Sequence, residues 1–406
     1  MPSDKHKAKS LNLLKAAGIT LLAFGLSLVL MQPFSLSIAT LISSNDRHDF
    51  NITDFYNIIA DRRQVRELDR DIVILDIKDA TREDVAVILD VLPELEPRAV
   101  GLDVMFDVPH DDDSLLLAAI AKLPDMVMIV DMEGDRERGA STFHIQDRSF
   151  FFDDMPGRTY GASNMPTKYA GGVVRQFVTD FPMKDLGTAM PSFAAAVAAK
   201  ASPEAAEALR RRGNRLETIN YPSRTFTVIP WQDLAYHADE LRDRVVLIGA
   251  MNVPSDMHAT PPQRMMSGIE IHAHTVSTIL GGRYLNPVGQ TGNMAMAFAL
   301  CFALAFIHVS IRTSYKALVL RILQIVLLYY IIRIGYHFFI DRSIIINFSY
   351  TLLMMTFVLF ACDIWLGVPG LVKDVSRGLR ALFRYVRRLL SDDSPWQSER
   401  DMSANQ

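Results

Sequence analysis

The apolar positions of this 406-residue chain form long unbroken runs near its ends and short runs between them. Four of the long runs approach the ~20 residues that an α-helix needs to cross the hydrocarbon core of a bilayer. They lie at residues 16–33, 294–311, 317–340 and 344–366. We therefore predict one transmembrane helix before a large central segment, residues 34–290, and three transmembrane helices after it.

Basic residues flank these runs on one side of the predicted membrane. Four lysines lie within residues 1–15, and Arg312 and Lys316 follow the second run. Further basic residues lie in the tail, residues 367–406. Because cytoplasmic segments of membrane proteins are enriched in lysine and arginine, we expect both termini in the cytoplasm and the central segment on the outer side.

The first apolar run has an alternative interpretation as a cleaved signal peptide. Ser37, Ile38 and Ala39 offer a small-residue cleavage site. The run is long for a signal peptide, which favours a retained anchor. Under either interpretation the central segment is exported.

The basic tail alternates apolar and charged positions at helical spacing over residues 371–390, and the polar residues after 390 are predicted to be disordered. An amphipathic basic helix of this kind binds along an anionic membrane surface, and docking to a partner protein is the alternative. The 40 residues of the tail are too few for a catalytic domain. The candidates for contact with lipid or a partner are Arg312, Lys316, Arg333, Arg380, Arg384, Arg387 and Arg388.

Short apolar runs alternate with helical patterns inside the central segment. Strands are predicted at residues 72–77, 99–106 and 126–132, with helices at 81–91 and 114–122 between them. This order produces parallel βαβ units with right-handed crossovers. Later elements continue the alternation, with helices at 191–201 and 203–212, strands at 226–231 and 245–250, and a helix or strand-to-helix transition at 268–280. We predict an α/β domain with a mostly parallel sheet.

Composition excludes two classes of function for this domain. Residues 34–290 hold 26 Lys and Arg against 38 Asp and Glu, a net charge of −12, whereas the rest of the chain carries +8. An acidic domain lacks the basic faces that bind nucleic acid. Both cysteines, Cys301 and Cys362, lie inside apolar runs, so the domain has no disulfide and no thiolate metal site.

Several aspartates follow the predicted strands. Asp76, Asp103 and Asp107 lie at the carboxyl ends of two strands that we expect to be neighbours. Open α/β sheets bind ligands at this edge. Grouped carboxylates also hold Ca²⁺ or Mg²⁺, but carboxylates that cap helices or bind loop amides have the same pattern. We predict ligand contact here and no metal.

A second group contains Glu270 and the histidines His258, His272 and His274. Two histidines at this spacing share a face on a strand and could hold zinc, whereas on a helix they point apart. We favour structural hydrogen bonding over zinc. Because the sequence has no strained Gly-x-Ser-x-Gly turn and no phosphate-binding glycine loop, we predict no catalytic residues, no cofactor and no enzymatic activity.

Six segments of the central region occur in a familiar order: LDIKDATRED, RAVGLDVMF, GGVVRQF, PSFAAAVA, RVVLIGAMNVPSDMHATPP and GIEIHAHTVSTILGG. Together they resemble the CHASE domain of the second type, an extracytoplasmic sensory domain attached to bacterial cyclases and kinases. The resemblance covers residues 34–287 and is most specific over 246–282. It implies one span before the domain and three after it. The best-matched positions are Asp256, Thr260, Pro261, Gly268, Glu270, His272 and Ala273.

The resemblance implies a multi-pass inner-membrane protein of a Gram-negative bacterium whose α/β domain is a periplasmic sensor. Because no output domain follows the last span, we expect an oligomeric receptor that signals to a separate cytoplasmic or membrane protein. A structural subunit of an envelope complex is the main alternative, and a metal-dependent periplasmic hydrolase is the third. The ligand-binding candidates are Asp76, Asp103, Asp107, Asp256, Glu270 and His272.

Overall fold

A computed structural model gives the fold of the chain as two compact units. The first, which we call the helical unit, comprises residues 1–34, 289–332 and 348–406, and the second, the α/β unit, comprises residues 35–288 and 333–347. The structure describes residues 2–42, 54–63, 67–111, 113–134, 142–167, 172–183, 188–213, 215–221, 224–262, 265–311 and 315–392.

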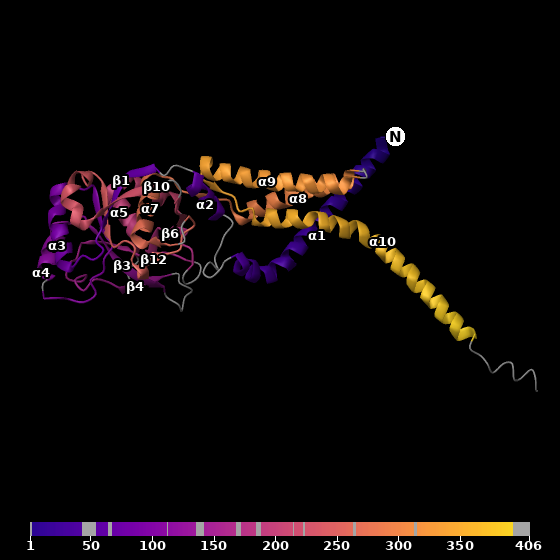
Figure 1. Ribbon diagram of the computed structural model, residues 1–406, viewed down its shortest axis with the longest axis horizontal. Coiled ribbons are helices and arrows are strands. Elements are labelled where there is room, and N and C mark those ends of the chain that lie inside the picture. Colours follow the sequence, from indigo (N-terminus) through magenta and orange to yellow (C-terminus); the bar gives the residue numbers. More distant parts are fainter. Residues whose placement is uncertain are drawn as a thin grey trace, which may run out of the picture. The chain divides into compact units, whose positions relative to one another are not determined.

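The α/β unit is built on a seven-stranded sheet (Figure 1). The strand order is β10-β1-β11-β2-β3-β4, and β5 also pairs with β3. Every pairing is parallel except that between β3 and β4. The predicted α/β class with a mostly parallel sheet is therefore confirmed. The strands are β1 (Glu67–Asp76), β2 (Ala99–Leu102), β3 (Val127–Gly134), β4 (Phe143–Asp147), β5 (Thr159–Ala162), β10 (Arg224–Pro230) and β11 (Val245–Gly249).

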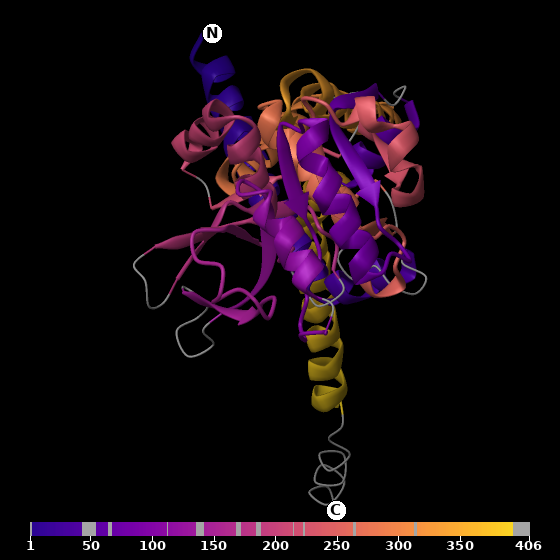
Figure 2. The same ribbon diagram turned by 90° about the vertical axis from the view of Figure 1, so that its left-hand side faces the viewer.

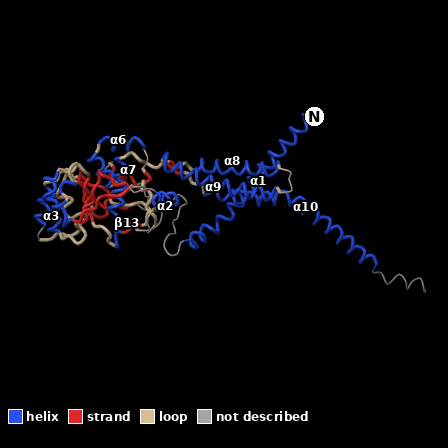
Figure 3. Tube along the Cα trace, turned by 45° about the horizontal axis from the view of Figure 1, so that its top comes forward, coloured by secondary structure: helices blue, strands red, loops and turns tan. Residues whose placement is uncertain are grey.

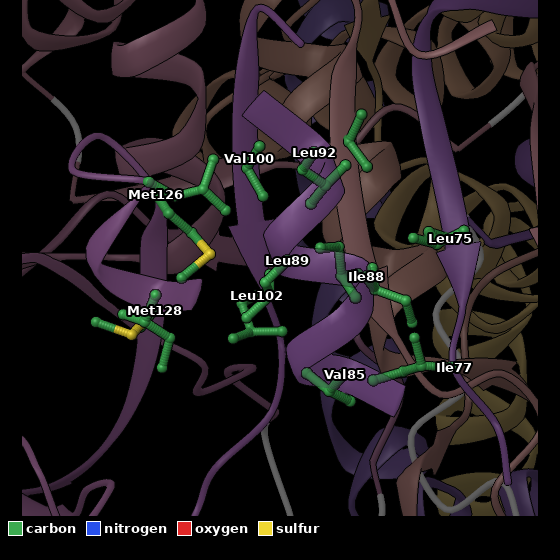
Figure 4. Close-up of a cluster of buried hydrophobic side chains, with 14 of the residues drawn as sticks. Leu75, Ile77, Val85, Ile88, Leu89, Leu92, Val100, Leu102, Met126 and Met128 are labelled. Atoms are coloured by element: carbon green, nitrogen blue, oxygen red, sulfur yellow. The ribbon is translucent and has the colours of Figure 1, made fainter. Parts of the chain in front are cut away.

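Helices cover both faces of the sheet, so that the strands form a layer between helices (Figure 3). On one face, Val73 and Leu75 of β1 join the core under α3 (Arg82–Val91) and α4 (Asp113–Ala121). Figure 2 looks onto this face, and Figure 4 shows its core side chains. The alternate residue Ile74 joins the other core. Two helices build that second core, α5 (Phe193–Ala201) and α7 (Gly268–Leu280).

Local sequence explains why α3 begins where it does. The Thr81 hydroxyl accepts a hydrogen bond from the Asp84 N–H at 3.2 Å, and the Thr81 N–H donates to the Asp84 carboxylate at 2.8 Å. This reciprocal capping box satisfies two N–H groups that the first turn leaves unpaired. The bonds from Thr81 also lower the pKa of Asp84. Thr81 is therefore the N-cap of α3.

Glycine allows α5 to pack directly on the sheet. A Cβ added at Gly161 of β5 would lie 2.5 Å from the Phe193 backbone, and one at Gly101 of β2 would lie 2.7 Å from Val197. These contacts are too short for any side chain. The close approach buries Phe193 and Val197 completely, which fixes α5 beside α7.

Smaller elements complete the α/β unit. Two helices, α2 (Asp54–Arg63) and α6 (Pro203–Arg212), lie outside the two central layers of helices. Four strand pairs lie outside the main sheet, namely β6 (Gln176–Val178) with β9 (Leu216–Thr218), β7 (Asp180–Pro182) with β8 (Ala189–Pro191), β12 (Met257–His258) with β13 (Met266–Ser267), and β14 (Asn286–Pro287) with β15 (Ile344–Ile345).

Two details of the predicted sheet were wrong. β11 lies between β1 and β2, so the strands expected to be neighbours are not paired with each other. In addition, β2 ends at Leu102 rather than at residue 106, because the Phe106 N–H donates to the Ser149 hydroxyl instead of to a neighbouring strand. β11 is formed by residues 245–249, far along the chain, so the hydrophobic pattern of β1 and β2 does not indicate that it lies between them.

Among the residues that the structure describes, four helices are long and apolar enough to cross a membrane, one near the N-terminus and three near the C-terminal end. Ala16, Ile19 and Ala23 of the first helix are fully buried in the core of the helical unit. A Cβ at Gly18 would lie 2.5 Å from the Trp365 ring, so small residues allow close packing of these helices. The helices are α1 (Pro2–Ile42), α8 (Gln290–Ser310), α9 (Lys316–Arg342) and α10 (Ser349–Asp392).

The last helix differs from the prediction at both ends. It begins at Ser349 rather than at residue 344, because Ile344 and Ile345 form β15. It then continues without interruption through Pro369 to Asp392, so the tail predicted as a separate helix is the end of α10. The predicted disordered residues after 392 lie outside the described residues.

Candidate functional site

The carboxyl edge of the sheet holds most of the residues that the sequence indicated. Asp76, at the end of β1, accepts hydrogen bonds from the N–H groups of Lys78 and Met251, both at 2.9 Å. Its carboxylate therefore joins the loops that follow β1 and β11. Asp76 therefore has a structural role at this edge, because its carboxylate binds backbone N–H groups of both loops.

Four further side chains interact at this edge, and we call them the carboxyl-edge cluster: Asp103, Asp256, His258 and His272. Asp256 receives the Gly268 N–H at 3.1 Å and lies 3.2 Å from Nε2 of His258. Burial, helped by the charge of Asp256, raises the pKa of Asp103 to about 7. Burial also lowers the pKa of His272 to about 4. Burial therefore favours the neutral form of both the Asp103 carboxyl group and the His272 imidazole.

The remaining candidates lie apart from this cluster. Asp107 is exposed in the loop after β2. Glu270 is on α7, and its charge contributes to the raised pKa of Tyr221. The structure thus brings together three of the six predicted ligand contacts, Asp103, Asp256 and His272.

The two histidines of α7 point to different neighbours. The His272 ring packs edge-on against Phe193 at a centroid distance of 5.0 Å. The His274 ring lies between Tyr221 and Phe226, at 5.2 and 4.9 Å. Because residues 268–280 form a helix, the two rings cannot share an ion. Among the described residues no group of three or more His, Cys, Asp or Glu side chains is placed to hold a metal.

Sequence reasoning missed a groove of about 440 Å³ at the opposite, amino edge of the sheet. Arg283 donates to the Ser277 hydroxyl at 2.6 Å, and this hydroxyl donates to the buried Asp69 carboxylate at 2.5 Å. Arg224 lies nearby, bonded to Glu67 at 3.2 Å. Burial and the charge of Arg224 hold the pKa of Arg283 below its usual range. The groove is lined by Glu67, Leu68, Asp69, Arg70, Asp71, Ile72, Arg224, Ser277, Leu280, Gly281 and Arg283.

The chain passes from this groove into a short paired segment, which we call the collar: β14, β15 and residues 333–342 of α9. The Asn286 N–H donates to the Ser343 carbonyl at 2.7 Å, and the Val288 N–H donates to that of Ile345 at 2.8 Å. Arg212 donates to the Asn286 side chain at 2.9 Å. The collar therefore joins the connection before α8 to the connection between α9 and α10.

Two contacts attach α2 to this region of the α/β unit. Asp54 and Arg175 form a bidentate ion pair, at 2.8 and 2.7 Å, in which the Asp54 side chain is buried. The Tyr56 ring stacks on Phe339 at 5.8 Å. These contacts fix the segment that follows α1 against Arg175 and against Phe339 near the end of α9.

The basic candidates divide between the two units. Arg333 is exposed and belongs to the α/β unit, whereas Arg380, Arg384 and Arg387 are exposed on α10. Arg312 and the side chains of Lys316 and Arg388 lie outside the described residues.

Comparison with known proteins gives one family. No curated protein and no solved structure matches the chain. The sequence profile of the CHASE2 domain matches residues 35–309, more than half of the chain, and this range contains the whole sheet, both edges and β14. The chain therefore belongs to the CHASE2 domain family, whose domain is an extracytoplasmic sensor, and combines this domain with four candidate membrane-spanning helices.

Proposed function

We propose that the protein is a receptor of a bacterial inner membrane, with both termini in the cytoplasm, that signals to a separate protein. The α/β unit detects a condition outside the cytoplasm, and the membrane helices transmit its change of state. The partner docks on cytoplasmic segments such as 312–316 or the end of α10. A transmitted signal requires a ligand or condition that has different affinity for two states.

One observation carries this proposal. Arg283 lines the groove, and Asn286, three positions along the chain, pairs with the α9–α10 connection. A shift of Arg283 therefore moves β14, which is bonded to β15 and directly precedes α8. Through β14 and its partner β15, few residues connect the groove to α8, α9 and α10. No residue of the carboxyl edge belongs to this connection.

The groove is the proposed entry point of the signal. Its lining combines the guanidinium groups of Arg224 and Arg283 with the carboxylate of Asp69. Burial and the positive charge of Arg224 disfavour the charged form of Arg283, so an anionic group placed beside Arg283 would stabilise that charged form. A small molecule that carries a carboxylate or phosphate fits this chemistry.

The decisive experiment locks the collar. Cysteines replace Asn286 and Ile344, which are direct partners in the parallel pair, in a full-length chain whose Cys301 and Cys362 are replaced by alanine. The N286C and I344C single variants are the matched controls. Oxidised and reduced samples in native membranes are crosslinked and purified, and the proteins that accompany each are identified by mass spectrometry.

The receptor proposal expects a kinase, cyclase or regulator whose recovery or activity changes when the collar is locked, and not in the single-cysteine controls. A fixed set of envelope components that is the same in both states would contradict it. That outcome would favour a structural subunit.

A further inference from the structure

α10 extends beyond the helical bundle (Figure 1). A regular apolar stripe runs along this extension and begins at Trp365, whose ring packs on Gly18 of α1. Seven residues recur at alternating spacings of three and four, and each is between 41% and 61% exposed. This spacing is the heptad repeat, in which positions a and d form the seam of a coiled coil. The residues are Trp365, Val368, Val372, Val375, Leu379, Leu382 and Val386.

The stripe continues a seam that is already packed inside the helical unit. Counting back from Trp365 with the same alternation gives Ala361, Val358, Met354 and Thr351, none more than 1% exposed. One face of α10 is therefore buried over its first half and exposed over its second. An exposed continuation of a packed seam indicates a further helix in register with it.

Charged residues avoid this seam. With Val372 at position a, every charged residue from 373 to 387 lies at position b, c or f, on the opposite side of the helix. Positions e and g, which flank the seam, hold only uncharged residues: Ser376, Gly378, Phe383 and Tyr385. The charged residues are Lys373, Asp374, Arg377, Arg380, Arg384 and Arg387.

This distribution decides between the possible occupants of the face. Two identical helices in parallel would place their arginines outward, so no like charges meet at the seam. A partner recognised through charge would require complementary residues at e and g, and the chain has none there. A flat position on the membrane would require α10 to break, whereas it is one helix from Ser349 to Asp392.

We propose that residues 368–386 of α10 pair with the same residues of a second copy of the chain, as a parallel coiled coil in register. Both copies have the same orientation in the membrane, which makes the pairing parallel. The pairing rests on the proposed function only for the cytoplasmic location of this segment. It gives the receptor a dimeric surface to which a partner protein binds and through which it responds to movement of the membrane helices.

Site-directed crosslinking of the full-length protein in native membranes tests the pairing. In a background with alanine at Cys301 and Cys362, single cysteines are placed at seam positions (V375C, L382C) and at outward positions (A381C, R384C). Mild oxidation followed by non-reducing electrophoresis measures the fraction of covalent dimer. We expect at least a tenfold higher initial rate of dimer formation at the seam positions.

A second set of variants tests whether the apolar seam causes the pairing. L382R in the V375C chain should abolish the covalent dimer, whereas A381R, one position away and outward, should leave it unchanged. Equal rates at seam and outward positions would overturn the proposal. A second result would also overturn it: seam cysteines that form no disulfide, together with quenching by brominated lipids of a fluorophore attached there. That result would place this face of α10 on the membrane.

The outcome is separable from that of the receptor proposal. If the seam cysteines form the covalent dimer while locking the collar changes the recovery of no partner protein, the receptor proposal fails and the pairing of α10 holds. If locking the collar changes the recovery of a partner protein while all four cysteines crosslink at the same rate, the receptor proposal holds and this dimer is excluded.

Discussion

The two edges of the central sheet have opposite characters. The carboxyl edge, where open α/β sheets usually bind ligands, is closed by bonds within the protein: Asp76 holds two loops, and Asp256 holds the first N–H of α7. The amino edge has an open groove in which three side chains, Asp69, Ser277 and Arg283, are linked.

This difference follows from where the chain leaves the domain. α7 runs along the sheet and ends at the amino edge, and Arg283 follows within three residues of its last turn. In the receptor that we propose, a displacement in the groove would reach β14 without crossing the core of the α/β unit.

The largest effect on stability should come from Asp69 at the amino edge. Asp69→Ala removes a buried carboxylate that accepts the Ser277 hydroxyl and lies 3.6 Å from Arg283. Loss of one partner leaves the other polar groups unsatisfied, so we expect a cost of about 3 kcal/mol in the free energy of unfolding. Urea denaturation of the full-length protein in detergent measures it, with the exposed Asp71→Ala as control. Equal effects of the two would show that the groove is not a linked network.

The sequence could predict the sheet, its helices and the membrane frame, because periodicity and caps such as Thr81 are local signals. It could not predict that β11 inserts between β1 and β2, nor the groove, because Asp69 and Ser277 are 208 positions apart. The charge of Arg283 just after a helix end was a visible clue, since cations favour helix C-termini. The pairing of β14 with β15 involves two residues per strand, too few to leave a pattern.

The carboxyl edge should respond to pH through two opposed groups. Asp103, with a pKa raised to about 7, binds a proton more tightly in the folded state, so it adds stability as pH falls from 7 toward 4. His272, with a pKa lowered to about 4, is protonated first in the unfolded state, so it removes stability as pH falls below its ordinary value of 6.5. The two slopes oppose each other between about pH 6.5 and 4.

Asp103→Asn should break this balance. Relative to the wild type, we expect the free energy of unfolding of the variant to fall by roughly 2 kcal/mol between pH 6.5 and 4.5. The reason is that protonation of Asp103 no longer offsets the destabilising effect of His272. At pH 8 the variant should be the more stable of the two, since it carries no buried charge. Urea denaturation across this pH range gives both values. Parallel pH profiles for variant and wild type would contradict the raised pKa of Asp103.

A smaller effect is expected from the contact between Asp256 and α7. A Cβ at Gly268 would lie 2.5 Å from the Asp256 carboxylate, which must then move and lose the Gly268 N–H. Because Asp256 is 44% exposed and free to swing outward, Gly268→Ala should cost only about 1 kcal/mol. The double variant with Asp256→Ala should be clearly non-additive, as expected for groups in contact. Additive costs would mean that the two residues do not interact.

A last comparison should separate two aspartates that the sequence treats alike, one of which gives the smallest effect expected. Asp76→Ala removes the acceptor of two backbone N–H groups and should cost about 1–2 kcal/mol, whereas exposed Asp107→Ala should change the free energy of unfolding by less than about 0.5 kcal/mol. Denaturation of both variants side by side measures the contrast. An equal cost at Asp107 would mean that its loop folds onto the edge and that the carboxyl edge is built as the sequence pattern predicted. A small cost at Asp107 would show that its side chain makes no stabilising contact, whereas the Asp76 carboxylate holds two loops together.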